Sequence, residues 1–155
     1  MIVPWQENCD WKKKLKEIIG RHCENSPSRQ EKVEVAEKIR QIYLHLDSLL
    51  DVLCARTCPG CEDICCRRAT VWFDEKDLSF LFLTEGEFPG KQVQRNEDGS
   101  CCFLGAAGCE LPRYRRPFIC TWYLCPAQKQ LLQDREEQIF GYIDEVKALR
   151  LRLRC

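Results

Sequence analysis

Residues 54–66 read CARTCPGCEDICC, which places five cysteines in thirteen positions. Sulfur atoms separated by two or three intervening residues can converge on one metal ion without strain. A second group follows at Cys101, Cys102, Cys109, Cys120 and Cys125. The interval 54–125 also has weak periodicity and recurrent Gly and Pro. We therefore expect an irregular metal-binding core that tertiary folding closes.

The cysteines limit the choice of metal. Thiolate ligands suit zinc and iron–sulfur clusters, whereas magnesium and calcium need gathered oxygen ligands. Zinc and iron–sulfur sites both use cysteine pairs separated by two residues, so the spacing leaves both open. The two histidines, His22 and His45, fall in the N-terminal helical part and are expected on helix surfaces. A mixed Cys/His zinc site is therefore disfavoured.

Helical patterns lie on both sides of this core. Residues 10–22, 29–53 and 127–153 carry apolar side chains at i, i+3, i+4 and i+7. Such stripes are too large to leave in water, so the flanking helices 29–53 and 127–153 should pack together. Residues 71–73 predict a short strand and residues 74–81 a helical turn.

The predicted fold is mainly α, a single domain over residues 1–155. Terminal amphipathic helices pack around an irregular cysteine-rich metal-binding lobe, residues 54–125, which has one or two short strands.

Composition bounds the compartment and the partners. Thirteen cysteines in 155 residues admit a disulfide scaffold as an alternative. The odd cysteine count and an N-terminus without the apolar run of a signal peptide favour a cytoplasmic protein. No run approaches the roughly 20 apolar residues of a membrane span, so we expect no membrane association. Lys plus Arg equal Asp plus Glu at 24 each, which disfavours nucleic acid as a partner.

The cysteine pattern resembles the YkgJ-type cysteine cluster family, described as zinc- or iron-chelating proteins. The resemblance covers roughly residues 54–125. It is carried by Cys58-x2-Cys61-x3-Cys65-Cys66, Val71, Asp77-Leu78, Asp98-Gly99-x-Cys101-x-Phe103-Leu104, Gly108-Cys109-x-Leu111, Arg116-Pro117-x2-Cys120 and Tyr123-x-Cys125.

The resemblance implies eight metal ligands: Cys58, Cys61, Cys65, Cys66, Cys101, Cys109, Cys120 and Cys125. The family usually has two residues before the Cys-Cys pair and this chain has three, which leaves open whether Cys65 or Cys66 points at the metal. The family is also similar to the cysteine-rich part of flagellin lysine methylases, a resemblance that favours a [4Fe–4S] cluster slightly over zinc. Cys54 and Cys102 lie outside the family pattern and stay undecided.

Other residues have less specific interpretations. Cys9, Cys23 and Cys155 are isolated and are not expected to bind metal. Arg113, Arg115 and Arg116 lie near aromatic residues, a pattern that also occurs in nucleic-acid patches. We expect these arginines instead to offset the charge of a thiolate cluster. Asp74 and Asp77 are expected at the surface, as is Arg150.

Two classes of function remain. Four-cysteine sites are usually closed, whereas catalysis needs an open metal position. We therefore expect a non-catalytic module whose iron–sulfur cluster or zinc is structural or carries electrons, and which docks on a protein partner. The alternative is a metalloenzyme or redox maturation factor, related to flagellin lysine methylase-type proteins, whose cluster takes part in chemistry. No motif identifies a catalytic residue or a small-molecule substrate.

Overall fold

A computed structural model describes residues 3–22, 27–62, 64–106, 108–132 and 135–153. The elements are α1 (Asn8–His22), α2 (Pro27–Thr57), α3 (Cys65–Arg68), α4 (Glu75–Glu85), β1 (Leu104–Gly105), β2 (Gly108–Cys109), the 3-10 helix η1 (Arg113–Arg115), α5 (Ile119–Trp122), α6 (Pro126–Leu132) and α7 (Glu136–Leu151). The fold is mainly helical with a small two-stranded sheet, as predicted. Across these described ranges, no helix is long and apolar enough to cross a membrane.

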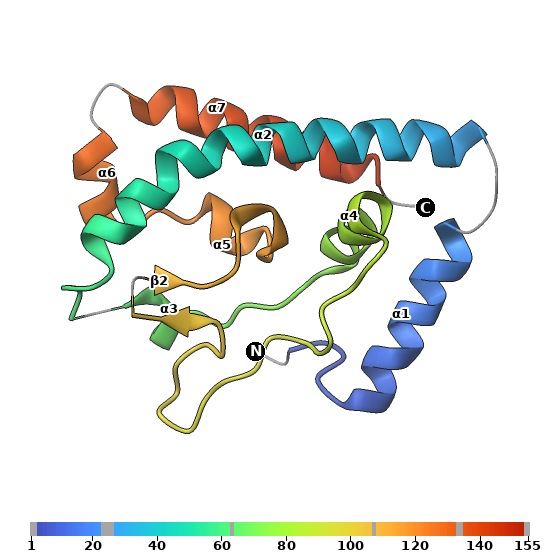
Figure 1. Cartoon of the computed structure of the whole chain (residues 1–155), viewed down its shortest axis with the longest axis horizontal. Helices are drawn as coiled ribbons and strands as arrows, with labels where there is room; N and C mark the ends of the chain where they lie inside the picture. The colour runs from blue at the N-terminus through green and yellow to red at the C-terminus, as the bar shows by residue number, and fades with distance from the viewer. Residues whose placement is uncertain (1–2, 23–26, 63, 107, 133–134, 154–155) are drawn as a thin grey trace.

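The longest helix, α2, runs beside α7 (Figure 1) and also contacts α4, α6 and η1. Both helices bury one apolar stripe in the same core, with Ile39 and Leu46 from α2 and Ile139, Ile143 and Val146 from α7. The opposite side of this core is closed by α4, which packs against α2 and α1. The packing of the two flanking helical segments is therefore confirmed.

The C-terminal helical segment is divided into two helices rather than one. In place of a helix over 127–153, α6 ends at Leu132 and α7 begins at Glu136. The two lie at an angle to each other (Figure 1) and both pack against α2. The apolar repeat of residues 127–153 predicts that α6 and α7 are both buried, but it does not predict a change of direction between them.

The strand predicted at residues 71–73 is wrong. A side chain takes the hydrogen bonds that a neighbouring strand would make: Phe73 N donates to Gln92 Oε1 at 2.7 Å, and Gln92 Nε2 donates to Phe73 O at 3.1 Å. The two strands lie instead at β1 and β2, which pair antiparallel with Leu104 opposite Cys109.

The start of α4 is capped and buried under α7. Asp74 Oδ1 accepts hydrogen bonds from the backbone of Lys76 and Asp77 at 2.8 Å, and Asp77 Oδ2 accepts one from Asp74 N at 2.9 Å. Arg150 of α7 donates to both carboxylates. The surface positions predicted for Asp77 and Arg150 are wrong, because these side chains are 4% and 3% exposed. Their pairing makes this burial possible.

The two histidines differ in their environment. His22 lies one turn beyond Ile18 on the buried face of α1, and its Nε2 is 3.1 Å from Ser79 Oγ of α4. The surface position predicted for His22 is therefore wrong. His45 is exposed on α2, as predicted, and its ring lies edge-on to Tyr142.

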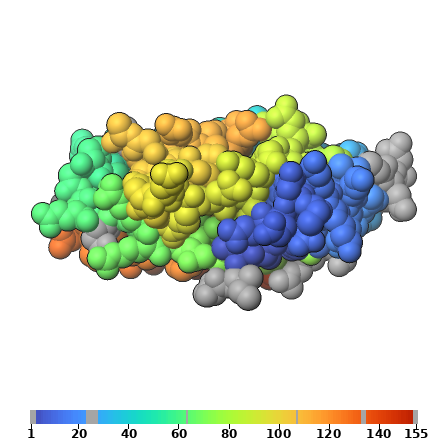
Figure 2. Space-filling model, turned by 90° about the horizontal axis from the view of Figure 1, so that it is seen from below, coloured from blue at the N-terminus to red at the C-terminus, as the bar shows by residue number. Residues whose placement is uncertain are grey.

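The remaining elements are short and lie beneath the C-terminal half of α2 (Figure 1). We call residues 58–69 and 100–125 the cysteine segments. Figure 2 shows the face below them, where the loop between α4 and β1 lies between α1 and the C-terminal end of α2. The cysteine segments are thus held at one end of the helical part.

Candidate metal centre

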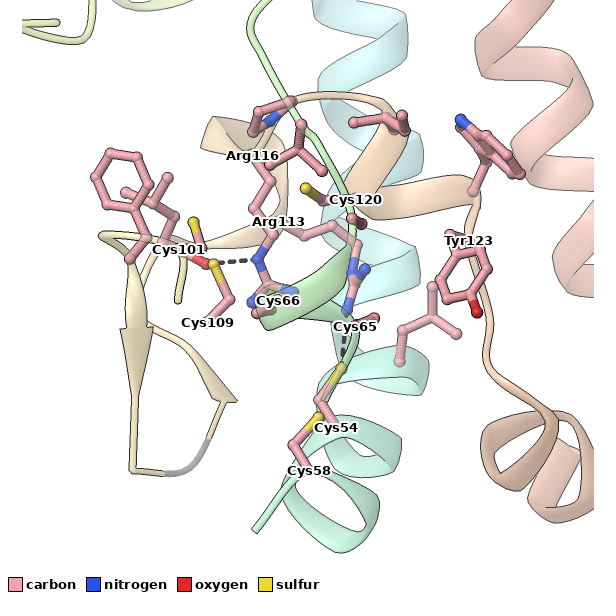
Figure 3. Close-up of a pocket in the computed structure, with 18 of the residues that line it drawn as sticks. Cys54, Cys58, Cys65, Cys66, Cys101, Cys109, Arg113, Arg116, Cys120 and Tyr123 are labelled. Atoms are coloured by element: carbon pink, nitrogen blue, oxygen red, sulfur yellow. Dashed lines mark hydrogen bonds between the residues drawn. The ribbon is translucent and has the colours of Figure 1, made fainter. Parts of the chain in front are cut away.

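A cavity of about 180 Å³ lies among the cysteine segments and the C-terminal end of α2. Thiols from both sequence groups line it (Figure 3). The seven are Cys54 of α2, Cys58 directly after α2, Cys65 and Cys66 of α3, Cys101 before β1, Cys109 of β2 and Cys120 of α5. These cysteines are thiols rather than disulfides. Folding therefore gathers around one space cysteines that are up to 66 positions apart, as in Cys54 and Cys120.

The last turn of α2 and the residue that follows it supply two of these thiols. Cys58 N donates to Cys54 O at 2.9 Å, so the two side chains stand one helical turn apart. Gly108, at the start of β2, has a φ of +114°. A methyl group there would lie 3.7 Å from Cys58 Cβ and 3.9 Å from Cys54 Cβ. The second cysteine group thus packs directly on the first, at a backbone conformation that favours glycine.

A backbone contact joins α3 to the stretch before β1. Cys101 N donates to Cys66 O at 2.8 Å. Arg95 donates to Cys66 O at 3.1 Å, to Arg67 O at 2.8 Å and also to Ala69 O. A cation at the C-terminal end of a helix satisfies its last carbonyls and interacts favourably with its dipole. Arg95 therefore fixes the short helix that carries two of the thiols.

The turn at Arg116-Pro117 delivers Cys120, as the sequence predicts. Cys120 N donates to Pro117 O at 2.9 Å, and α5 begins one residue before Cys120. The same prediction placed Cys61 and Cys125 at this centre, but neither lines the cavity. Two of the eight predicted ligands thus lie outside the cavity lining.

The other cysteines are divided between described and undescribed positions. Cys54, outside the family pattern, lines the cavity, whereas Cys102 does not. The sequence signal for Cys54 is its i, i+4 relation to Cys58 at the end of a helical pattern. Cys9 is exposed on α1. Cys23 and Cys155 lie outside the described residues.

Burial raises the pKa of several thiols that line the cavity. It raises the pKa of Cys58 to about 11 and that of Cys120 to about 12. Burial also raises the pKa of Cys101 and Cys109. For Cys66, a hydrogen bond with the Cys65 thiol is the larger cause of the raised pKa, and burial adds to it. A metal ion must therefore displace protons from these sulfurs.

The thiols also raise one another's pKa values. After burial, Cys109 and Cys101 contribute to the raised pKa of Cys120. The same two thiols contribute, after the Cys65 hydrogen bond and burial, to the raised pKa of Cys66. Cys54 and Cys65 act in this way on Cys58. Cys54 likewise contributes to the raised pKa of Cys109, so thiols of the two sequence groups influence one another.

Buried arginines border the cavity. Arg113 and Arg116 are 2% and 8% exposed. Their Nη2 atoms lie 2.8 Å and 3.2 Å from Asp51 Oδ1. Both residues line the space that the thiols surround. Their ion pairs bury both guanidinium groups, and both lie beside the thiols that line the cavity.

Comparisons of this chain with models of known families, with curated proteins and with solved structures find no match. Its function is therefore inferred from the cavity.

The donor set fits a thiolate-ligated metal in number and type. Four sulfurs complete a zinc or iron–sulfur site, and seven cysteines line the cavity. Within the described ranges, however, no three Cys, His, Asp or Glu side chains are placed as a ready group for a metal ion. Cysteine side chains move between staggered χ1 rotamers, so ligation requires at least rotations of this kind.

Proposed function

We propose that this chain is a metal-binding cysteine cluster protein whose thiols hold an iron–sulfur cluster or zinc, and which acts as a structural or electron-carrying module. One observation carries the proposal: seven cysteines from separate segments line a single cavity. Buried thiols used only as small apolar side chains need no such gathering. Among the residues of this cavity, sulfur is the abundant metal-binding atom, which favours soft metals over Mg²⁺ and Ca²⁺.

Iron–sulfur is the preferred occupant within this proposal. The resemblance to the YkgJ-type family and to flagellin lysine methylases favours a [4Fe–4S] cluster. Arg113 and Arg116 support the same choice, because positive charge beside the sulfurs tunes the reduction potential of a cluster. When bound, such a cluster supplies one-electron transfer, whereas zinc supplies a structural cross-link.

A second candidate is a metalloenzyme or redox maturation factor. The observation that favours it is the wall of the cavity beside Cys120, where Trp122, Tyr123 and Leu124 also line the space. Trp122 and Tyr123 are 44% and 47% exposed. An apolar, partly open wall next to a metal gives room for a small molecule. Exposed apolar side chains on α2, such as Leu44 and Val52, instead suit the protein partner of the first proposal.

Cysteine replacement tests the metal site. The full chain is purified without oxygen as wild type and as Cys58→Ser, Cys120→Ser and Cys9→Ser. We expect bound metal and its absorption spectrum to be lost in Cys58→Ser and Cys120→Ser, because both side chains line the cavity. Cys9→Ser, on the exposed face of α1, should match the wild type. Full metal retention in both cavity variants, or no metal in the wild type, contradicts the proposal.

A further inference from the structure

We propose that Cys54 is a thiolate ligand of the metal centre and that Gln128 and Arg113 orient its sulfur. This inference rests on the proposed metal-binding function. It adds a ligand that the cysteine pattern of the resembling family does not include.

The first support is that two donors converge on this sulfur. Gln128 Nε2 lies 3.5 Å from Cys54 Sγ, and Arg113 Nη2 lies 3.9 Å from the same atom. Both donor side chains are buried, with 8% and 2% of their surfaces exposed. Figure 3 shows the Arg113 contact as a dashed line toward Cys54. A sulfur that accepts from a guanidinium and an amide is placed to carry negative charge, as a metal-bound thiolate does.

The second support is that other groups fix both donors. Gln128 Oε1 accepts a hydrogen bond from Cys125 N at 3.2 Å, which directs the amide nitrogen rather than the oxygen toward Cys54. Arg113 is held by Asp51 at 2.8 Å and by Asp47 at 3.5 Å. The donors thus keep their direction without help from the sulfur. Cys125 lies outside the cavity lining but contributes through its backbone.

The third support is the place of Cys54 on α2. It stands one turn before Cys58, and both residues lie under the close approach of Gly108. Side chains four residues apart share one face of a helix, so the two thiols present a pair to the same space. Cys54 is held on the helix, and the hydrogen bond from Cys58 N to Cys54 O ties Cys58 to its end, so this pair is placed more precisely than two cysteines on a loop.

The main test uses the wild-type chain and measures alkylation of each cysteine by mass spectrometry. The chain is treated with iodoacetamide after loading with Zn²⁺, or with Fe²⁺ and sulfide, and again after chelation. We expect loading to slow the reaction of Cys54 at least tenfold, together with that of Cys58. Cys102 is the internal reference, because it has a similar intermediate exposure but does not line the cavity.

The outcomes separate this inference from the proposed function. If loading protects Cys58 and Cys120 while Cys54 reacts equally fast with and without metal, Cys54 is not a ligand, although the metal site stands. If loading protects no cysteine, the metal site and this inference both fail.

A second test examines the orienting role of Gln128. Gln128→Leu removes the amide donor, and Gln130→Leu makes the same change at an exposed position of α6. We expect Gln128→Leu to weaken Zn²⁺ binding about 10- to 100-fold and to shift the absorption bands of the iron-loaded chain, because hydrogen bonds to a ligand tune it. Gln130→Leu should change neither. Equal affinities and spectra for the two variants would overturn the role of Gln128.

Discussion

The helical part of this protein and its cysteine segments are stabilised in different ways. The helices α1, α2, α4 and α7 share a continuous core that includes the fully buried Ile18, Ile39 and Leu46. Of the buried apolar side chains in the described ranges, only Cys101, Pro117 and Leu124 belong to the cysteine segments. Their elements are two to four residues long and surround a cavity. The helical part is therefore stabilised through burial, whereas we expect the order of the cysteine segments to depend on metal bound by their thiols.

Metal removal should give the largest difference in amide protection between the two regions. Thiolate sites contribute on the order of 10 kcal/mol to the ordering of small metal-binding folds. Chelation should therefore abolish amide protection in residues 58–69 and 100–125 while the middle of α2 keeps its own. Hydrogen exchange with and without chelator measures this. Equal protection of the cysteine segments in both states would show that metal does not organise them.

Metal uptake should depend steeply on pH. The pKa values of Cys58 and Cys120, about 11 and about 12, lie above the ordinary 9.0. Each thiol that becomes a ligand therefore releases a proton at neutral pH, and the apparent affinity should rise about tenfold per pH unit for each proton released.

The metal-free chain should show the opposite trend. Its native state holds these protons more tightly than the unfolded chain does, so its stability should fall as pH rises from 9 toward 12. Zn²⁺ titrations between pH 6 and 8 and urea unfolding at higher pH measure the two slopes. Zn²⁺ affinity that does not change with pH would mean that the sulfurs are already ionised.

Shortening a buried side chain in the helical core should destabilise the helical part whether or not metal is bound. Leu46 is fully buried and Leu44, two residues away on α2, is 45% exposed. Leu46→Ala should lower the free energy of unfolding by about 3 kcal/mol, and Leu44→Ala by less than about 0.5 kcal/mol. Denaturant unfolding of the metal-free chain measures both. Similar losses in the two variants would mean that α2 does not bury this stripe.

The smallest effect concerns glycine. Gly108 has a φ of +114°, whereas Gly141 lies in α7 with open space around it. Gly108→Ala should cost about 1–2 kcal/mol through backbone strain. Gly141→Ala should gain about 0.5–1 kcal/mol through helix propensity. Unfolding of the metal-bound chain measures these opposite signs. A gain in both variants would show that the backbone of β2 relaxes freely.

Helical periodicity predicted the elements whose stability comes from burial. The apolar repeat of residues 29–53 predicted α2, and the acidic start of residues 74–81 predicted α4. The apolar repeats of α1 and α7 also indicate burial of two polar residues. Arg150 lies one turn after Val146, and His22 one turn after Ile18, so both are on apolar faces. Charge alone suggested a surface position for Arg150, because its partners Asp74 and Asp77 are more than seventy residues away.

Spacing predicted that the two cysteine groups would meet, but not which thiols would face the cavity. Cys58 and Cys61 are a ligand pair by spacing, yet α2 ends at Thr57, a turn follows from Cys58 to Cys61, and Cys61 does not line the cavity. Cys54 was undecided because its position depends on how far the helix extends. The strand predicted at 71–73 failed for a similar reason, since the side chain of Gln92 binds there from a distant segment.

The pairing of α2 with α7 also sets an order of events during synthesis. Cys58 precedes Arg150 by about 90 residues, which a ribosome adds in roughly 5 to 20 s. During that interval the first thiols have been made, whereas the helix that covers α2 and completes the cap of α4 has not. Metal captured by the nascent chain would therefore bind before the helical part has folded, and metal supplied later would enter a scaffold already closed by α7. Pulse-labelling with metal during translation can distinguish early from late loading.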